Sequence, residues 1–152
     1  MATRAKEEVW STLKNQVTEA LELEKVRLGS ILSELEQTSK TLVELAEMKK
    51  DYHPDRLAPS VRNSASIGQI RRNWNFVSSL EEAIRKTNQQ KLLIKKKEKE
   101  IRRKCIQLEN ELKKYQTLED RAIAKRRKSE ALKESKASDE MAAIYWLRQK
   151  AE

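Results

Sequence analysis

The chain has 152 residues and a formal net charge of +9, and 84 of the 152 are Ala, Glu, Lys, Leu or Arg, a composition typical of long helices and coiled coils. With only two glycines and two prolines, it has too few turn residues for a multi-stranded sheet. The single cysteine excludes an intramolecular disulfide, and no apolar run has the length of a membrane span or leads from the N-terminus as a signal region. We therefore expect a cytoplasmic protein.

The first helix is predicted over residues about 3–52, because apolar side chains recur there mostly in steps of three and four. This first stripe consists of Trp10, Leu13, Val17, Leu21, Leu28, Ile31, Leu35, Leu42, Leu45, Met48 and Tyr52. Polar Glu24 and Thr38 occupy two further positions of the stripe. Proline disfavours helical geometry at the residue before it, so Pro54 should end this helix near Tyr52.

The second helix is predicted over residues about 67–148, after a loop over about 53–66. Ser66 and Gln69 match a capping box, in which the serine oxygen and the glutamine side chain pair with backbone amides at a helix start. From Val77 to Ala122 the alternation of three and four residues is strict for 14 positions. This second stripe consists of Val77, Leu80, Ile84, Thr87, Lys91, Ile94, Glu98, Ile101, Cys105, Leu108, Leu112, Tyr115, Glu119 and Ala122.

Two long helices joined by one loop predict an all-α fold, namely a long antiparallel two-helix coiled-coil hairpin with an overhanging C-terminal helix. We expect it to form a single elongated coiled-coil domain over residues 1–152. If Tyr52 faces residue 69, the numbers of paired residues add up to about 121, which places Leu28 beside Ile94.

In this register the first helix ends opposite about residue 118, so the segment from Arg121 to Glu152 has no partner within the chain. The segment is rich in Ala, Lys and Glu, which favours a helix that frays easily. It contains an apolar cluster of Met141, Ile144, Tyr145, Trp146 and Leu147. This cluster predicts docking on another protein, with a disordered tail as the alternative.

Few residues of the chain are suited to catalysis. The only histidine, His53, lies beside a proline in the predicted loop, where we expect it to be exposed to solvent. Cys105 occupies a position of the second stripe, where a small apolar side chain is needed for packing. No glycine-rich phosphate loop is present, and a two-helix hairpin offers no enclosed pocket. We therefore expect no enzyme activity, no catalytic residue, no cofactor and no metal.

Two basic segments could bind an acidic partner. Residues 91–104 carry eight cations and two glutamates, and residues 121–136 carry seven cations and two glutamates. Such a charge suffices for electrostatic binding to nucleic acid, but neither segment has an aromatic residue that could stack on a base. A basic nucleic-acid-binding coiled coil and a generic coiled-coil adaptor therefore remain alternatives. We expect a charged face that is solvated or that pairs with an acidic protein surface, in a monomer that binds no nucleic acid.

The end of the hairpin next to the loop has more apolar residues than pairing of two helices requires. Phe76, Leu80, Ala83 and Thr87 form a second line beside the stripe, opposite Thr41, Leu45, Met48 and Tyr52. Part of this wide apolar face should reach solvent, and exposed patches of this kind mark protein-interaction sites. The alternative is a tightly wrapped end, with the aromatic rings folded back onto the loop.

The same residues resemble the FliJ family of the bacterial flagellar type III export apparatus, which is related to the YscO-like stalk proteins of virulence secretion systems. The first helix ends in LAEMKKDY over residues 45–52, where the family has a leucine, an aromatic residue and a closing tyrosine. Residues 75–84, NFVSSLEEAI, are similar to the family segment Phe-x-x-x-Leu-x-x-Ala-Ile. Residues 115–121 and 138–142 are similar to two further family segments. In two places this chain departs from the family, with Met48 and Thr87 where an aromatic residue and a histidine are common.

The resemblance implies a non-enzymatic stalk that inserts in the hexameric export ATPase, touches the membrane-embedded export gate protein and cooperates with export chaperones. Such a protein is cytoplasmic and peripherally associated with the inner membrane. The residues implied for gate binding are Phe76, Leu80, Ala83 and Thr87, supported by Leu45, Met48 and Tyr52. The residues implied for ATPase binding, at the opposite end, are Trp10, Arg121, Lys125, Arg126, Arg127 and Lys128.

Overall fold

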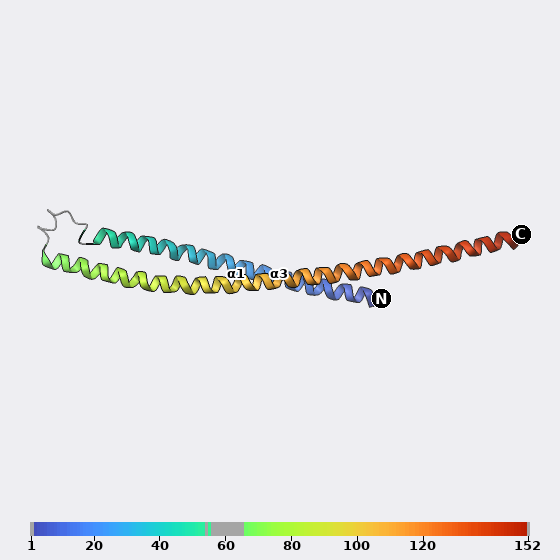
Figure 1. Ribbon diagram of the computed structural model, residues 1–152, viewed down its shortest axis with the longest axis horizontal. Coiled ribbons are helices and arrows are strands. Elements are labelled where there is room, and N and C mark those ends of the chain that lie inside the picture. Colours follow the sequence, from blue (N-terminus) through green and yellow to red (C-terminus); the bar gives the residue numbers. More distant parts are fainter. Residues whose placement is uncertain (1, 54, 56–65, 152) are drawn as a thin grey trace. The chain divides into compact units, whose positions relative to one another are not determined.

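The structure, a computed structural model, describes residues 2–53, 55 and 66–151, with side chains from Arg4 onward. It confirms the all-α fold: helix α1 spans Ala2–Tyr52 and helix α3 spans Ile67–Ala151 (Figure 1). The predicted bounds were about 3–52 and 67–148. Most of the predicted loop, including both prolines, lies outside the described residues. No described helix is long and apolar enough to span a membrane.

The start of α3 is capped by Ser66. Its side-chain Oγ accepts a hydrogen bond from the backbone N–H of Gln69 at 3.2 Å. Its carbonyl oxygen accepts hydrogen bonds from the N–H groups of Gln69 and Ile70, at 3.0 and 3.1 Å. A serine oxygen at this position satisfies an amide that has no partner within the helix, which explains why α3 begins at Ile67.

The contacts within the chain divide it into two units, and each contains a segment of both helices. The loop unit comprises Glu24–Lys104, and the terminal unit comprises Met1–Leu23 with Cys105–Glu152. In each unit the segments of α1 and α3 pack antiparallel. Lys49 pairs with Glu81 in the loop unit, and Lys14 pairs with Glu119 in the terminal unit.

The cores of both units follow the predicted stripes. In the loop unit Val77, Leu80 and Ile94 are buried, and in the terminal unit Val17, Leu21 and Cys105 are buried. All 14 positions of the second stripe are buried or half-buried, including the four that carry polar side chains. In the first stripe the residues from Trp10 to Leu45 are also buried or half-buried, whereas Met48 and Tyr52 are exposed.

The predicted register is wrong by about one heptad. In the loop unit Tyr52 packs on Phe76, with ring centroids 4.9 Å apart, rather than facing residue 69. The same displacement places Leu28 opposite Ile101 rather than opposite Ile94. In agreement with this, Ile101 lines one groove together with Arg27 and Ile31. A slip of seven residues superposes a heptad stripe on itself, so the apolar pattern alone does not distinguish the two registers.

In the terminal unit the paired part of α3 continues further than predicted. Glu7 pairs with Arg126, with Oε1 and Nε 2.8 Å apart, although the first helix was expected to end opposite about residue 118. Every described side chain from Arg127 to Ala151 is exposed. The unpaired segment of α3 therefore begins at Arg127 rather than at Arg121, and it is helical as far as Ala151.

Candidate protein-binding surfaces

The candidate surface in the loop unit is centred on an aromatic pair. The rings of Tyr52 and Phe76 meet edge to face at an interplanar angle of 72°, an arrangement that aromatic quadrupoles favour. Tyr52 remains 48% exposed and Phe76 40% exposed, and Met48 is exposed as well. We call these three residues the loop-end patch. Their side chains retain apolar surface that packing of α1 on α3 leaves uncovered.

Four other predicted residues of this region are less accessible than the loop-end patch. Leu45, Ala83 and Thr87 are half-buried. Leu80 is only 6% exposed, and with Val77 it belongs to the core of the loop unit. Leu80, which belongs both to the second stripe and to the line beside it, is therefore a packing residue between the helices rather than part of the exposed surface.

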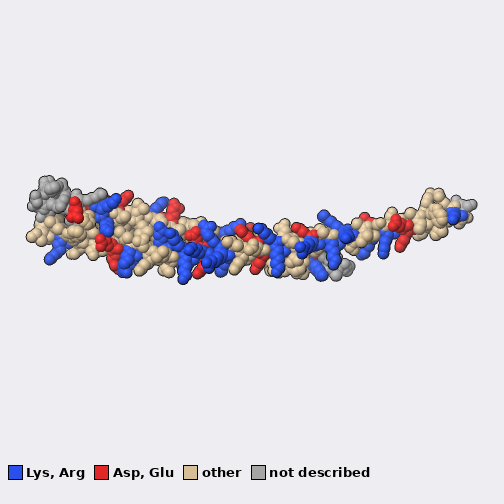
Figure 2. All heavy atoms as spheres, viewed as in Figure 1, with Lys and Arg blue, Asp and Glu red and all other residues tan. Residues whose placement is uncertain are grey.

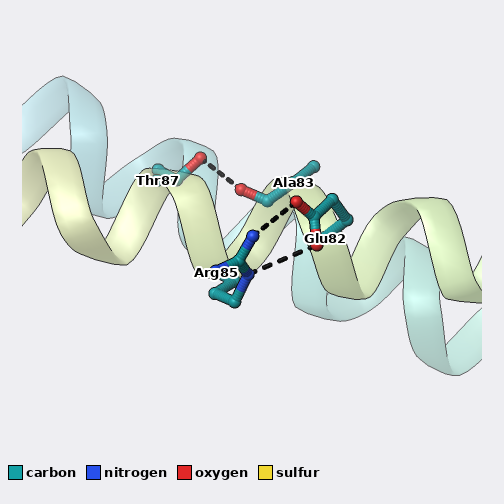
Figure 3. Close-up of polar contacts among 4 residues, drawn as sticks. All are labelled: Glu82, Ala83, Arg85 and Thr87. Atoms are coloured by element: carbon teal, nitrogen blue, oxygen red, sulfur yellow. Dashed lines mark hydrogen bonds and ion pairs between the residues drawn. The ribbon is translucent and has the colours of Figure 1, made fainter.

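Thr87 uses its hydroxyl group within its own helix. The Oγ1–H donates a hydrogen bond to the carbonyl oxygen of Ala83 at 2.7 Å (Figure 3). Threonine in a helix commonly satisfies its hydroxyl in this way. The group that Thr87 can offer to a partner is consequently its methyl group, so Thr87 supplies apolar contact where a histidine would supply a donor or a charge.

Next to this line, Glu82 and Arg85 form a forked ion pair on the exposed side of α3 (Figure 3). Arg85 donates from Nη2 to Oε1 at 2.6 Å and from Nε to Oε2 at 3.3 Å. The hydrogen bonds and the charge of Arg85 lower the pKa of Glu82 below its ordinary value of 4.5. The same contacts with Glu82 raise the pKa of Arg85.

We expect the Glu82 carboxyl to titrate below pH 4.5 in the native chain and to return toward that value in Arg85→Gln. A lowered pKa means that the pair favours the folded state above the ordinary pKa, and that this contribution is lost as the pH falls through the lowered value. Carbon-13 NMR of the side-chain carboxyl measures both titrations. Identical titration curves in the two proteins would contradict the ion pair.

A second aromatic contact in the loop unit had no signal in the apolar pattern. His53 was expected to be exposed, but it is half-buried, and its ring lies edge to face on Trp74 with centroids 4.9 Å apart. Its Nδ1 accepts a hydrogen bond from the backbone N–H of Asp55 at 3.3 Å. Trp74 lies outside the second stripe, so periodicity alone does not identify it. This contact holds the residue after α1 against the start of α3.

In the terminal unit, two of the predicted ATPase-binding residues take part in contacts between the helices. Trp10 stacks on Tyr115, with ring centroids 6.1 Å apart and an interplanar angle of 24°. Arg126 pairs with Glu7, and Lys14 pairs with Glu119 at 3.1 Å between Nζ and Oε2. We call these three contacts the terminal clasp. Its charged side chains are largely shielded from water, which strengthens their attraction relative to surface pairs.

The other predicted ATPase-binding residues, Arg121, Lys125, Arg127 and Lys128, are exposed. Lys and Arg side chains are prominent on the visible face of α3 (Figure 2). The basic segment 91–104 contributes to this surface in the loop unit, although Arg102 is paired with Glu98 at 2.9 Å. Exposed cations of this density attract acidic surfaces over several ångströms before contact.

The accessible groups of the described residues include apolar and charged side chains. Among these residues there is no cluster of three or more His, Cys, Asp or Glu side chains that could hold a metal ion. Cys105 is buried in the core of the terminal unit. Aromatic and aliphatic side chains are accessible at the loop end and near the end of α3, and cations are accessible along α3.

Comparison with protein families gives one match. The family model described as the flagellar FliJ protein matches residues 10–151 of this chain. This range includes the whole loop unit, most of the terminal unit, the loop-end patch, and the terminal clasp apart from Glu7. No curated protein and no solved structure matches the chain.

Proposed function

Since the chain belongs to the FliJ family and is therefore a component of the flagellar export apparatus, we propose that it acts there as a stalk between two partners. The family is a structural part of the apparatus and is not known as an enzyme family. The proposed partners are the hexameric export ATPase, whose ring the stalk enters, and the membrane-embedded export gate protein. Export chaperones are a third proposed partner, and the proposed location is the cytoplasmic side of the inner membrane.

The observation that carries the gate contact is the exposure of the Tyr52–Phe76 pair. Two aromatic rings that are both about half accessible form a compact apolar surface, and aromatic side chains contribute strongly to protein interfaces. Met48 enlarges this surface with a flexible side chain that adapts to the shape of a partner. Leu45, Ala83 and Thr87 extend it, whereas Leu80 supports it from the core.

The ATPase contact is supported by the cations of the terminal unit. Arg127 and Lys128 are exposed and lie directly after Arg126, the last residue of α3 with a described contact to α1. An acidic lining inside a ring would attract such a surface and orient the stalk by charge. In this proposal Trp10 and Arg126 hold α1 in place, and the free cations around them make the contact.

The experiment that tests the stalk measures ATP hydrolysis and ring assembly by the cognate export ATPase, with and without one equivalent of this protein. We expect faster hydrolysis and more hexamer in the presence of the native chain. The double variant Arg127→Glu, Lys128→Glu should reduce this stimulation at least about tenfold, because it replaces attraction by repulsion at the contact.

A matched control is Lys133→Glu, Lys136→Glu, which makes the same change in net charge on exposed residues further along α3. This control should keep most of the stimulation. Equal loss in both variants would show that only total charge matters. If the native chain has no effect on hydrolysis or assembly, the stalk proposal fails, and salt-dependent binding of nucleic acid to segment 91–104 becomes the next function to test.

A further inference from the structure

The unpaired segment of α3 contains an apolar cluster that none of the described residues covers. Met141, Ile144, Tyr145, Trp146 and Leu147 are all at least half exposed. A polar stretch from Arg127 to Ser138 separates the cluster from the residues that pack on α1, with Leu132 as its one large apolar side chain. The cluster is therefore a separate surface rather than a continuation of the helix pair.

Most of these apolar residues lie on one side of α3. Residues three and four positions apart share a side of a helix, which places Met141, Ile144, Tyr145 and Arg148 together, flanked by Leu147. Trp146 follows Ile144 by two residues and therefore points to the other side. There its ring is in contact with Lys150, whose Nζ lies 4.4 Å from the ring centroid.

The charges around this side are arranged symmetrically about Ile144. Glu140 lies four residues before it and Arg148 four residues after it, and both are exposed. If two copies of this segment pack antiparallel with Ile144 at the two-fold axis, Glu140 of each copy faces Arg148 of the other. A parallel arrangement would place Glu140 beside Glu140 and Arg148 beside Arg148, which like charges oppose.

We propose that this segment of α3 is an interface with a second copy of this chain, packed antiparallel about Ile144. Self-complementary charge at both ends of an apolar centre is the property that a two-fold symmetric interface requires. Apart from Met48 and Tyr52 of the loop-end patch, the stripe residues of each unit are buried or half-buried between α1 and α3, so the dimer uses this segment alone. The proposal departs from the monomer expected from the sequence, and it is independent of the proposed stalk function.

The interface is short, so the dimer is weak. It spans about three turns of one helix from each copy, which is less than a standard protein interface. We expect a dissociation constant of roughly 10 µM to 1 mM. Sedimentation equilibrium of the full chain over this concentration range should show a reversible monomer–dimer equilibrium.

Charge reversal at the two ends tests the arrangement. Arg148→Glu and Glu140→Arg should each weaken the dimer at least about tenfold, because each change creates two repulsive contacts across the axis. The double variant restores opposite charges in reversed order and should bring the dissociation constant back to within about threefold of the native value. Trp146→Ala is the matched control: it removes an exposed aromatic ring of the same cluster on the other side and should leave association unchanged.

A cross-link provides a second measurement. In a Cys105→Ala background, Ile144→Cys should form a disulfide-linked dimer on mild oxidation, since residue 144 faces its own copy at the axis. Two results would overturn the proposal. The first is a native chain that stays monomeric at about 1 mM, the upper bound of the dissociation constant expected for an interface of this size. The second is a dimer whose dissociation constant is unchanged in Arg148→Glu. Loss of the dimer in both single variants without recovery in the double variant would exclude the antiparallel pairing.

Discussion

Replacing Leu80 with alanine is expected to lower the free energy of unfolding of the loop unit by about 2–3 kcal/mol. Leu80 is 6% exposed and belongs to the core of the loop unit together with Val77, which is 1% exposed. Truncation removes buried methyl groups and leaves space that two helices refill only in part, which places the cost at the lower end of the range for Leu→Ala. Urea unfolding followed by circular dichroism measures the change, and hydrogen exchange locates it in the loop unit.

Phe76→Ala is the control for this prediction. Phe76 is 40% exposed, and its ring meets Tyr52 edge to face. We expect a loss of about 1 kcal/mol in stability, because an aromatic pair contributes about 0.5–1.5 kcal/mol. The proposed gate contact, in contrast, should weaken more in Phe76→Ala than in Leu80→Ala when both variants are compared while folded. A Leu80→Ala variant of native stability that loses binding to the gate protein would show that Leu80 is a surface residue after all.

Trp10→Ala is expected to release the first turns of α1 from α3 and to cost about 1–3 kcal/mol in the terminal unit. Trp10 is half-buried and stacks on Tyr115 between the ion pairs Glu7–Arg126 and Lys14–Glu119. Removing the ring exposes both pairs to water, which screens their attraction. The terminal clasp should therefore open as a unit. Hydrogen exchange of the amides of residues 4–14 measures this opening.

Trp146→Ala again serves as the matched control, since it removes the same side chain from the same unit. Trp146 is 57% exposed and has no described contact with α1. Amide exchange of residues 4–14 should be unchanged in this variant, whereas it should become at least about tenfold faster in Trp10→Ala. Equal effects of the two substitutions would mean that the stacking on Tyr115 does not hold the first turns of α1.

Exposure also changes how the predicted binding residues are interpreted. The sequence patterns behind the proposed gate and ATPase contacts do not distinguish a side chain that packs from one that is free to bind. In the structure Phe76 is exposed and Leu80 is buried, although they are only four positions apart. The neighbours Arg126 and Arg127 differ in the same respect, since Arg126 is half-buried and Arg127 is exposed.

Local rules in the amino-acid sequence were sufficient to predict the two helices and the positions of the second stripe that face inward between them. Heptad spacing identified all 14 buried or half-buried positions of the second stripe, because a side chain's place around a helix depends only on its position in the chain. The start of α3 after its Ser66 cap and the end of α1 at Tyr52 are also local, because each depends only on residues next to it in the chain. The ordered motifs of the family, which extend along most of the chain, indicated the family to which it belongs.

The pairing of the two helices was decided only in the tertiary structure. A heptad pattern repeats after seven residues, so the apolar stripes have similar contacts in either register. Large side chains break this degeneracy: Tyr52 meets Phe76, and His53 meets Trp74. These contacts depend on residues about 20 positions apart along the chain, and no local pattern encodes them. The same pairing buries Leu80 and leaves Phe76 accessible, because a side chain's exposure depends on the helix that packs against it.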